Sequence, residues 1–152
     1  MKILKSIIFS LALFIVTVPA SADVFSKAHK YVGLHESSNR GTLREVTRVD
    51  PVRTPWCAAF VNGVLREAGL SGTRSNTARS FTKYKQATRT PQKGDIVVIR
   101  RKGGSGAHVG FFKGFVKRNG RNMVAVVGGN QSNKVSVAYY STSKVISYRR
   151  VA

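Results

Sequence analysis

The change in hydrophobic pattern at Pro91 is the feature that most constrains the fold of this chain. Before it, apolar residues recur at helical spacing. After it, they form short runs of Val, Ile, Phe and Tyr separated by Gly and Asn. Helices followed by closely spaced strands imply an antiparallel sheet in an α+β domain. A chain of 152 residues without repeats or a low-complexity linker has the length of one domain.

The helical part contains one strong pattern and two weaker ones. Residues 57–69 place apolar side chains on one side and end at a glycine, which predicts a helix. Residues 24–34 and 76–84 predict two further helices, whereas the polar stretch 36–55 is expected to be irregular. Five strands are expected in the second part, at 96–100, 109–116, 123–127, 135–140 and 145–149. Asn119-Gly120 between two of them is typical of a hairpin turn.

Residues 1–22 have the pattern of a secretory signal peptide. Two lysines precede an apolar run at 7–18, and small residues at 20–22 form a cleavage site before Asp23. A membrane span needs roughly 20 apolar residues, so this run is too short for an anchor. We therefore expect export to the periplasm or the extracellular space, no stable membrane anchor after cleavage, and a single mature domain at 23–152.

The single cysteine, Cys57, excludes an intramolecular disulfide and a Cys-rich zinc site. In an exported protein an unpaired thiol indicates either an intermolecular bridge or a reactive nucleophile, although free cysteines are often simply buried. Cys57 stands where a loop becomes a helix, and the positive end of the helix dipole favours a thiolate there. His108, flanked by small residues, is the candidate base, and Asn130 is a candidate to orient its ring or else part of a plain turn.

Several short motifs appear in a characteristic order along the chain. They are PWCAAFVN at 55–62, AGL at 68–70, ARS at 78–80, PQKGDIVV at 91–98, HVGF at 108–111 and GGNQSN at 128–133, with Gly33 and Glu36 upstream. In these motifs the chain resembles the NlpC/P60 and CHAP superfamily of cell-wall peptidases and amidases. The resemblance implies a papain-like fold with N-terminal helices packed on a C-terminal sheet. It also implies Cys57 as nucleophile, His108 as base and Asn130 as the third catalytic residue, with no metal or cofactor.

The resemblance implies an exported peptidoglycan hydrolase that cleaves an amide bond of the stem peptide. An endopeptidase and an N-acetylmuramoyl-L-alanine amidase fit the same residues, and an acyltransferase could use the same thioester. Four residues are candidates for substrate contact, each with a plainer alternative. Trp56 could line a groove or seal the core, Glu36 could face the cleft or solvent, and Asn76 and Arg79 could bind carboxylates or lie on a solvated helix face.

The formal net charge of +20 falls to +18 when Lys2 and Lys5 leave with the signal peptide. A charge this high opposes a compact fold through self-repulsion and points to an anionic partner. Peptidoglycan and other anionic envelope polymers suit an exported monomer. Nucleic acid is disfavoured, since no nucleic-acid-binding signature is present. A non-enzymatic basic protein that binds the envelope or nucleic acid is the alternative function.

Overall fold

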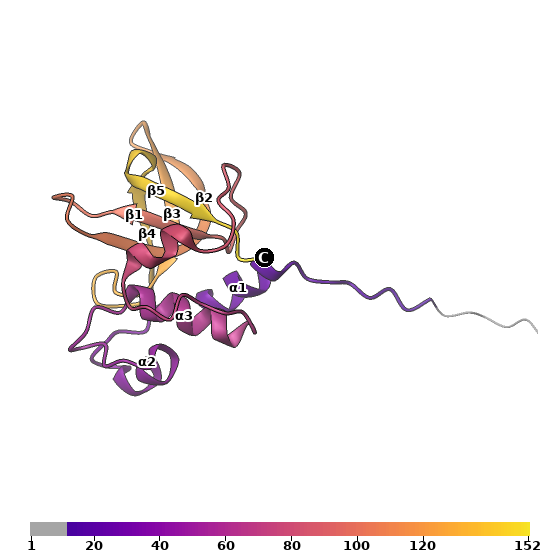
Figure 1. Cartoon of the computed structure of the whole chain (residues 1–152), viewed down its shortest axis with the longest axis horizontal. Helices are drawn as coiled ribbons and strands as arrows, with labels where there is room; N and C mark the ends of the chain where they lie inside the picture. The colour runs from indigo at the N-terminus through magenta and orange to yellow at the C-terminus, as the bar shows by residue number, and fades with distance from the viewer. Residues whose placement is uncertain (1–11) are drawn as a thin grey trace, which may run out of the picture.

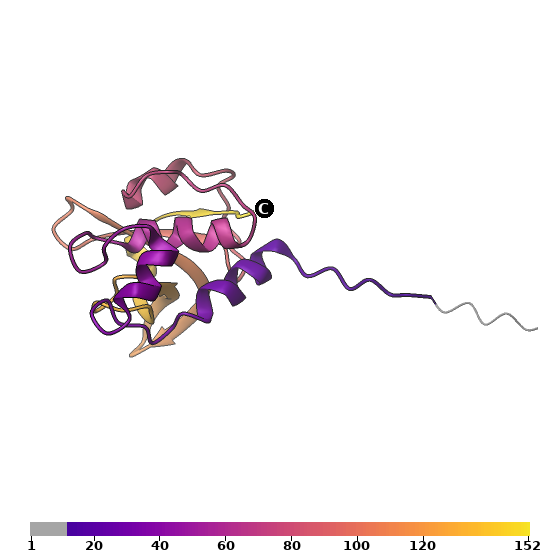
Figure 2. The same cartoon turned by 90° about the horizontal axis from the view of Figure 1, so that it is seen from below.

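The structure is a computed structural model that describes residues 12–152. Its α-helices gather on one side of a five-stranded sheet, and the two views agree on this arrangement (Figure 1 and Figure 2). The order of elements, helices first and strands after, confirms the α+β class expected from the sequence.

Within the described residues, three α-helices and two short 3-10 helices make up the helical part. They are α1 (Ala20–His29), α2 (Arg40–Thr47), α3 (Cys57–Glu67), η1 (Ala78–Lys83) and η2 (Thr142–Lys144). The central helix is α3, which buries most of its residues against the sheet on one side and α1 and α2 on the other. The apolar pattern of α3 is therefore almost continuous, as expected for a helix covered on more than one face.

The helix α2 lies in the stretch that the sequence predicted to be irregular, so that prediction is wrong. Only Leu43, Val46 and Thr47 are buried in it, which is too short an apolar pattern to stand out from the polar residues around it. Its place depends on close packing with α3. A Cβ atom at Gly63 would lie 2.3 Å from the carbonyl oxygen of Val46, so the two helix backbones can approach this closely only at a glycine.

The five expected strands are all present and antiparallel. They are β1 (Ile96–Arg100), β2 (Ala107–Arg118), β3 (Arg121–Gly128), β4 (Ser136–Ser141) and β5 (Val145–Arg149), in the spatial order β4-β3-β2-β1-β5. The β2–β3 hairpin is longer than predicted and turns through Asn119 and Gly120, whose φ angles of 49° and 73° are both positive. Two successive positive φ angles are the signature of the tight hairpin turn that Asn-Gly favours.

The last residues of the chain are held by a buried carboxylate. Asp95, 1% exposed, accepts hydrogen bonds from the Arg150 side chain at 3.1 Å and from the Val151 N–H at 3.3 Å. The C-terminus consequently lies beside the start of α1 (Figure 1 and Figure 2). There a Cβ atom at Gly94 would lie 1.8 Å from the carbonyl oxygen of Ser21, so α1 also packs closely on this corner.

The predicted signal peptide is described only in part. Its lysines and the beginning of its apolar run fall in residues 1–11, outside the described residues. The rest of the run extends away from the domain with exposed apolar side chains (Figure 1). Helix α1 begins at Ala20, so the predicted cleavage bond before Asp23 lies within its first turn. Among residues 12–152, no helix has both the length and the apolar character needed to cross a membrane.

Candidate active site

Cys57 is the first residue of α3, and its side chain is 5% exposed. The helical hydrogen bonds begin with the Phe60 N–H and the Trp56 carbonyl. The N–H groups of the first turn therefore lie outside the helical ladder and point out of the end of the helix. These N–H groups can donate hydrogen bonds to an oxyanion that forms next to the Cys57 sulfur. The Pro-Trp sequence before Cys57 ends the preceding loop, so local sequence fixes where the helix begins.

His108 is the second residue of β2 and is almost fully buried. Its Nε2 atom lies 2.9 Å from Oε1 of Gln131. The amide nitrogen of Gln131 donates to the Ser136 carbonyl at 2.7 Å, which fixes the orientation of the amide with its oxygen toward the imidazole. An oxygen can only accept, so Nε2 carries the proton and Nδ1 is left as the basic nitrogen.

The pKa of His108 is lowered to about 4, chiefly because the ring is buried, and the positive charge of Arg101 makes a small contribution in the same direction. The hydrogen bond with Gln131 acts in the opposite direction but is the smaller effect. The imidazole is therefore neutral at pH 7, the form that can accept a proton from a thiol.

Tyr140 completes the group around the imidazole. Its hydroxyl donates to the same Oε1 atom of Gln131 at 3.0 Å, and its ring centroid lies 5.6 Å from that of His108. Burial raises the pKa of Tyr140 to about 12, and the nearby Cys57 contributes in the same direction. Oε1 of Gln131 thus accepts two hydrogen bonds, one from His108 and one from Tyr140, and together they hold the amide in place.

The loop between β3 and β4 connects the histidine to the start of α3. A Cβ atom at Gly128 would lie 3.2 Å from Nε2 of His108, and one at Gly129 would lie 2.6 Å from the Trp56 ring. The two glycines let the backbone pass closely over the residue before Cys57 and beside the imidazole. The sequence Gly-Gly at this place is therefore a packing requirement of the site rather than a simple turn.

The residue hydrogen-bonded to the imidazole is Gln131, one position after Asn130, which the resemblance implied as the third catalytic residue. Asn130 has a left-handed backbone, with φ at 55°, and within the described part of the chain its side chain makes no hydrogen bond to His108. The next residue, Gln131, makes that bond instead. The sequence offers one reason to consider Gln131, because it carries an amide side chain next to Asn130. It offers none for Tyr140, which lies in an ordinary strand pattern.

The other predicted contact residues are spread around the domain. Trp56 is fully buried, which matches the second of its two alternatives, and its Nε1–H donates to Glu36 at 3.0 Å. That bond ties the loop carrying Glu36 to the residue before the thiol. Asn76 and Arg79 are exposed, and Asn76 lines a groove of about 490 Å³ between α2 and α3.

A hollow of about 400 Å³ adjoins the histidine. His108, Asn130, Gln131 and Tyr140 form its polar side. Its remaining residues include four cations and no carboxylate; these cations are Arg100, Arg101, Lys102 and Lys144. Elsewhere among residues 12–152, no three His, Cys, Asp or Glu side chains come together as metal ligands would.

Comparison with known proteins gives one family. The sequence profile of the CHAP domain matches residues 49–130, which include Cys57, His108 and Asn130. No curated protein sequence matches the chain. One solved structure similar to it is a lipoprotein-like protein of the NLP/P60 family from Staphylococcus aureus subsp. aureus Mu50, at 17% identity and a TM-score of 0.48. The similarity covers 87% of this chain but only 41% of the other, so this chain spans about two fifths of that protein.

Proposed function

The chain belongs to the CHAP domain family, and on this basis we propose that it is a cysteine hydrolase that cleaves an amide bond in peptidoglycan. The observation that carries the proposal is the ordered group around His108. Its hydrogen bond to Gln131 leaves Nδ1 basic, on a buried ring next to the loop that packs on the start of α3. A buried neutral histidine is suited to accepting the proton of the single thiol, Cys57, whose preceding residue Trp56 packs under the same Gly128-Gly129 loop that passes beside the imidazole.

The proposed reaction is hydrolysis of an amide through a thioester on Cys57. Nδ1 of His108 accepts the thiol proton, and the Cys57 sulfur attacks the amide carbonyl carbon. The N–H groups at the start of α3 bind the oxygen of the tetrahedral intermediate. The C–N bond then breaks as His108 gives its proton to the leaving amine. A water molecule, deprotonated by the same nitrogen, attacks the thioester, and the acid product and the free thiol are released.

Gln131 is assigned the positioning role in place of Asn130. Its oxygen accepts the Nε2 proton and so keeps the ring in the tautomer and orientation in which Nδ1 can act. Replacing Gln131 with Ala should therefore lower kcat far more than replacing Asn130 with Ala. Equal losses in the two variants would contradict this assignment.

The test is a digest of purified peptidoglycan analysed by mass spectrometry. The wild-type protein should release fragments with one new amine and one new carboxyl group, and their masses identify the bond that is cut. Cys57→Ala and His108→Ala should release none, whereas His29→Ala, which removes an exposed histidine of α1, should match the wild type. Unchanged cleavage in the first two variants would refute the mechanism. Binding without any cleavage would favour the non-enzymatic alternative.

Export is part of the proposal. The apolar side chains between Leu13 and Val18 are exposed and pack on nothing in the domain, which is an unfavourable arrangement for a permanent part of a protein in water. Removal of residues 1–22 eliminates that exposed surface. N-terminal sequencing of the protein recovered outside the cytoplasm should begin at Asp23.

A further inference from the structure

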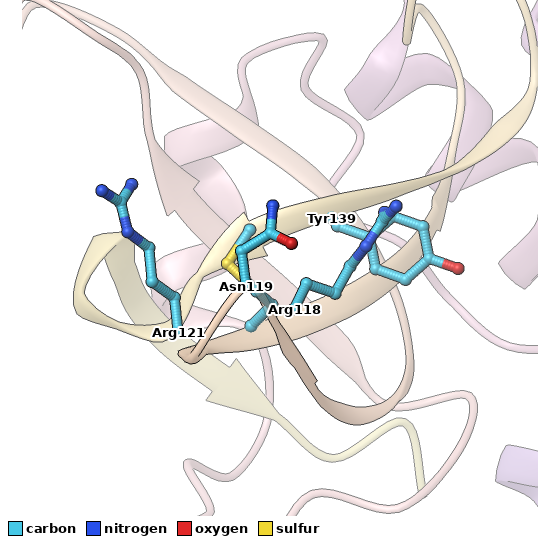
Figure 3. A pocket seen from close by; sticks show the side chains of 5 residues that line it. Arg118, Asn119, Arg121 and Tyr139 are labelled. Atoms are coloured by element: carbon cyan, nitrogen blue, oxygen red, sulfur yellow. The ribbon is translucent and has the colours of Figure 1, made fainter.

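A groove at the far end of the β2–β3 hairpin is not explained by the proposed reaction. It has a volume of about 590 Å³ and is lined by Arg118, Asn119, Arg121, Met123 and Tyr139 (Figure 3). The strand β3 leads from this groove to the loop at the active site. At about 3.3 Å per residue, its length separates the two by roughly 23 Å. A ligand in the groove would therefore not contact the reacting atoms.

The groove is the uncovered end of the face of the sheet on which the helices pack. Side chains alternate between the faces of a strand, so Arg121 and Met123 share a face of β3 with Val127. Val127 belongs to the core under the helices, but the helices do not extend to the hairpin tip. At Gly114, on the neighbouring strand, an added Cβ would meet nothing within 4 Å, so this end of the face is open.

Two arginines stand directly opposite each other at the hairpin tip. Arg118 pairs with Arg121 in the register of β2 and β3. Like charges in this position destabilise a hairpin. In the part of the chain that the structure describes, neither arginine forms an ion pair with a carboxylate. Their side chains extend apart on either side of Asn119, as Figure 3 shows. The repulsion is left uncompensated within the described residues, and negative charges bound next to each guanidinium group would relieve it.

Tyr139 holds one of these arginines in place. The guanidinium carbon of Arg118 lies 4.2 Å from the centroid of the Tyr139 ring, in a cation–π contact. A guanidinium stacked in this way has already lost much of its freedom, and its N–H edge remains available for a two-point contact with an anion. The stacking also covers one face of the Tyr139 ring, and Tyr139 is the aromatic residue among the five that line the groove. This disfavours single-stranded nucleic acid, whose bases need open aromatic faces.

We propose that this hairpin groove binds phosphate groups of a phosphodiester-linked polymer of the cell envelope. The proposal rests on the proposed export of the protein. Successive phosphates of a flexible polymer can reach both diverging guanidinium groups at once, which a single small anion cannot. The net charge of +18 would attract such a polymer over long range, and the groove would provide the specific contact. Binding here would hold the enzyme on the wall while the active site remains free.

The experiment measures binding of labelled poly(glycerol phosphate) to the Cys57→Ala protein by fluorescence anisotropy at one low salt concentration. The double variant Arg118→Gln/Arg121→Gln should bind at least about tenfold more weakly, since it removes two charge-assisted contacts. The matched control is Arg44→Gln/Arg89→Gln, which removes the same charge from exposed arginines elsewhere and should change binding by less than about twofold. Equal weakening in both double variants would refute a specific groove.

Two further comparisons test the chemistry of the site. Tyr139→Ala should weaken binding although it removes no charge, whereas Tyr139→Phe keeps the ring and should bind like the parent; no effect of the alanine would refute the role of stacking. Polyglutamate of similar length and vesicles of phosphatidylglycerol should bind more weakly than the phosphate polymer. Equal or tighter binding to either would overturn the assignment to a phosphodiester polymer. All these proteins carry Cys57→Ala, so a failure of the hydrolase proposal does not affect the result.

Discussion

The buried neutral His108 should make the stability of the protein depend on pH in a specific way. Burial lowers its pKa to about 4 in the folded chain from the ordinary value of 6.5. Between these two values the unfolded chain binds a proton that the folded chain does not. The folded state is therefore favoured above pH 6.5, and this contribution is lost as the pH falls toward 4.

The size of the effect follows from the two pKa values. One pKa unit corresponds to about 1.36 kcal/mol, so the full difference is about 3.4 kcal/mol. Between pH 7.5 and pH 4.5 the free energy of unfolding should fall by about 2.5 kcal/mol because of this one group. Typical domains have a total stability of about 5–15 kcal/mol, so the change is large enough to measure.

The perturbation is His108→Gln, which keeps a polar side chain but removes the titrating group. Urea unfolding, followed by the fluorescence of the buried Trp56, gives the free energy of unfolding at pH 7.5 and 4.5 for each protein. Between pH 7.5 and pH 4.5, the free energy of unfolding should fall by about 2.5 kcal/mol less in the variant than in the wild type. Carboxylates that titrate over this range contribute equally to both proteins, so the comparison cancels them.

The exposed His29 provides the control for simple loss of an imidazole. His29→Gln should keep the pH dependence of the wild type. If His108→Gln loses stability with falling pH as steeply as the wild type, to within about 0.5 kcal/mol, the reasoning is refuted. The same protonation should stop catalysis, so activity should decline as the pH falls toward 4 rather than near 6.5.

Three further substitutions test the packing. Gly129→Ala should lower the free energy of unfolding by roughly 1–3 kcal/mol, because its Cβ would lie 2.6 Å from the Trp56 ring; an unchanged melting temperature would contradict this contact. Gly41→Ala should raise stability by about 0.5–1 kcal/mol in urea unfolding, since nothing lies within 4 Å of the added Cβ in α2, and a loss would show that this helix is misplaced. Asp95→Asn should cost roughly 1.5–3 kcal/mol in the same assay by weakening the bond to Arg150, and a neutral result would mean that the buried carboxylate does not hold the C-terminus.

The strands were predictable because each is a short run of Val, Ile, Phe or Tyr bounded by turn residues. The start of α3 at Cys57 was predictable for a similar local reason, since a Pro-Trp pair precedes a regular apolar pattern. In contrast, α2 depends on contact with Gly63 of α3, a residue distant in sequence. A helix that is held mainly by tertiary packing leaves little trace in its own eight residues.

The same distinction applies to the candidate site. Cys57 and His108 were identifiable as candidates because few thiols and imidazoles exist in the chain. The partner of the imidazole was displaced by one residue, since the left-handed backbone at Asn130 determines which amide faces the ring. The backbone conformation at Asn130 depends on Gly128 and Gly129 before it and on the Trp56 ring beneath this loop. The sequence pattern alone does not reveal that conformation.

The pairing of β5 with β1 determines when the chain can finish folding. The other neighbouring strands of the sheet follow one another in sequence, but one edge of β1 stays open until β5 is available. The bond from Arg150 to Asp95 joins residues 55 positions apart. The sheet is therefore completed only when residues 145–151 are in place, and non-local contacts of this kind slow folding. Until β5 pairs, the backbone N–H and C=O groups along one edge of β1 have no strand partner, and this open edge is where the folding chain is most exposed to pairing with the wrong strand.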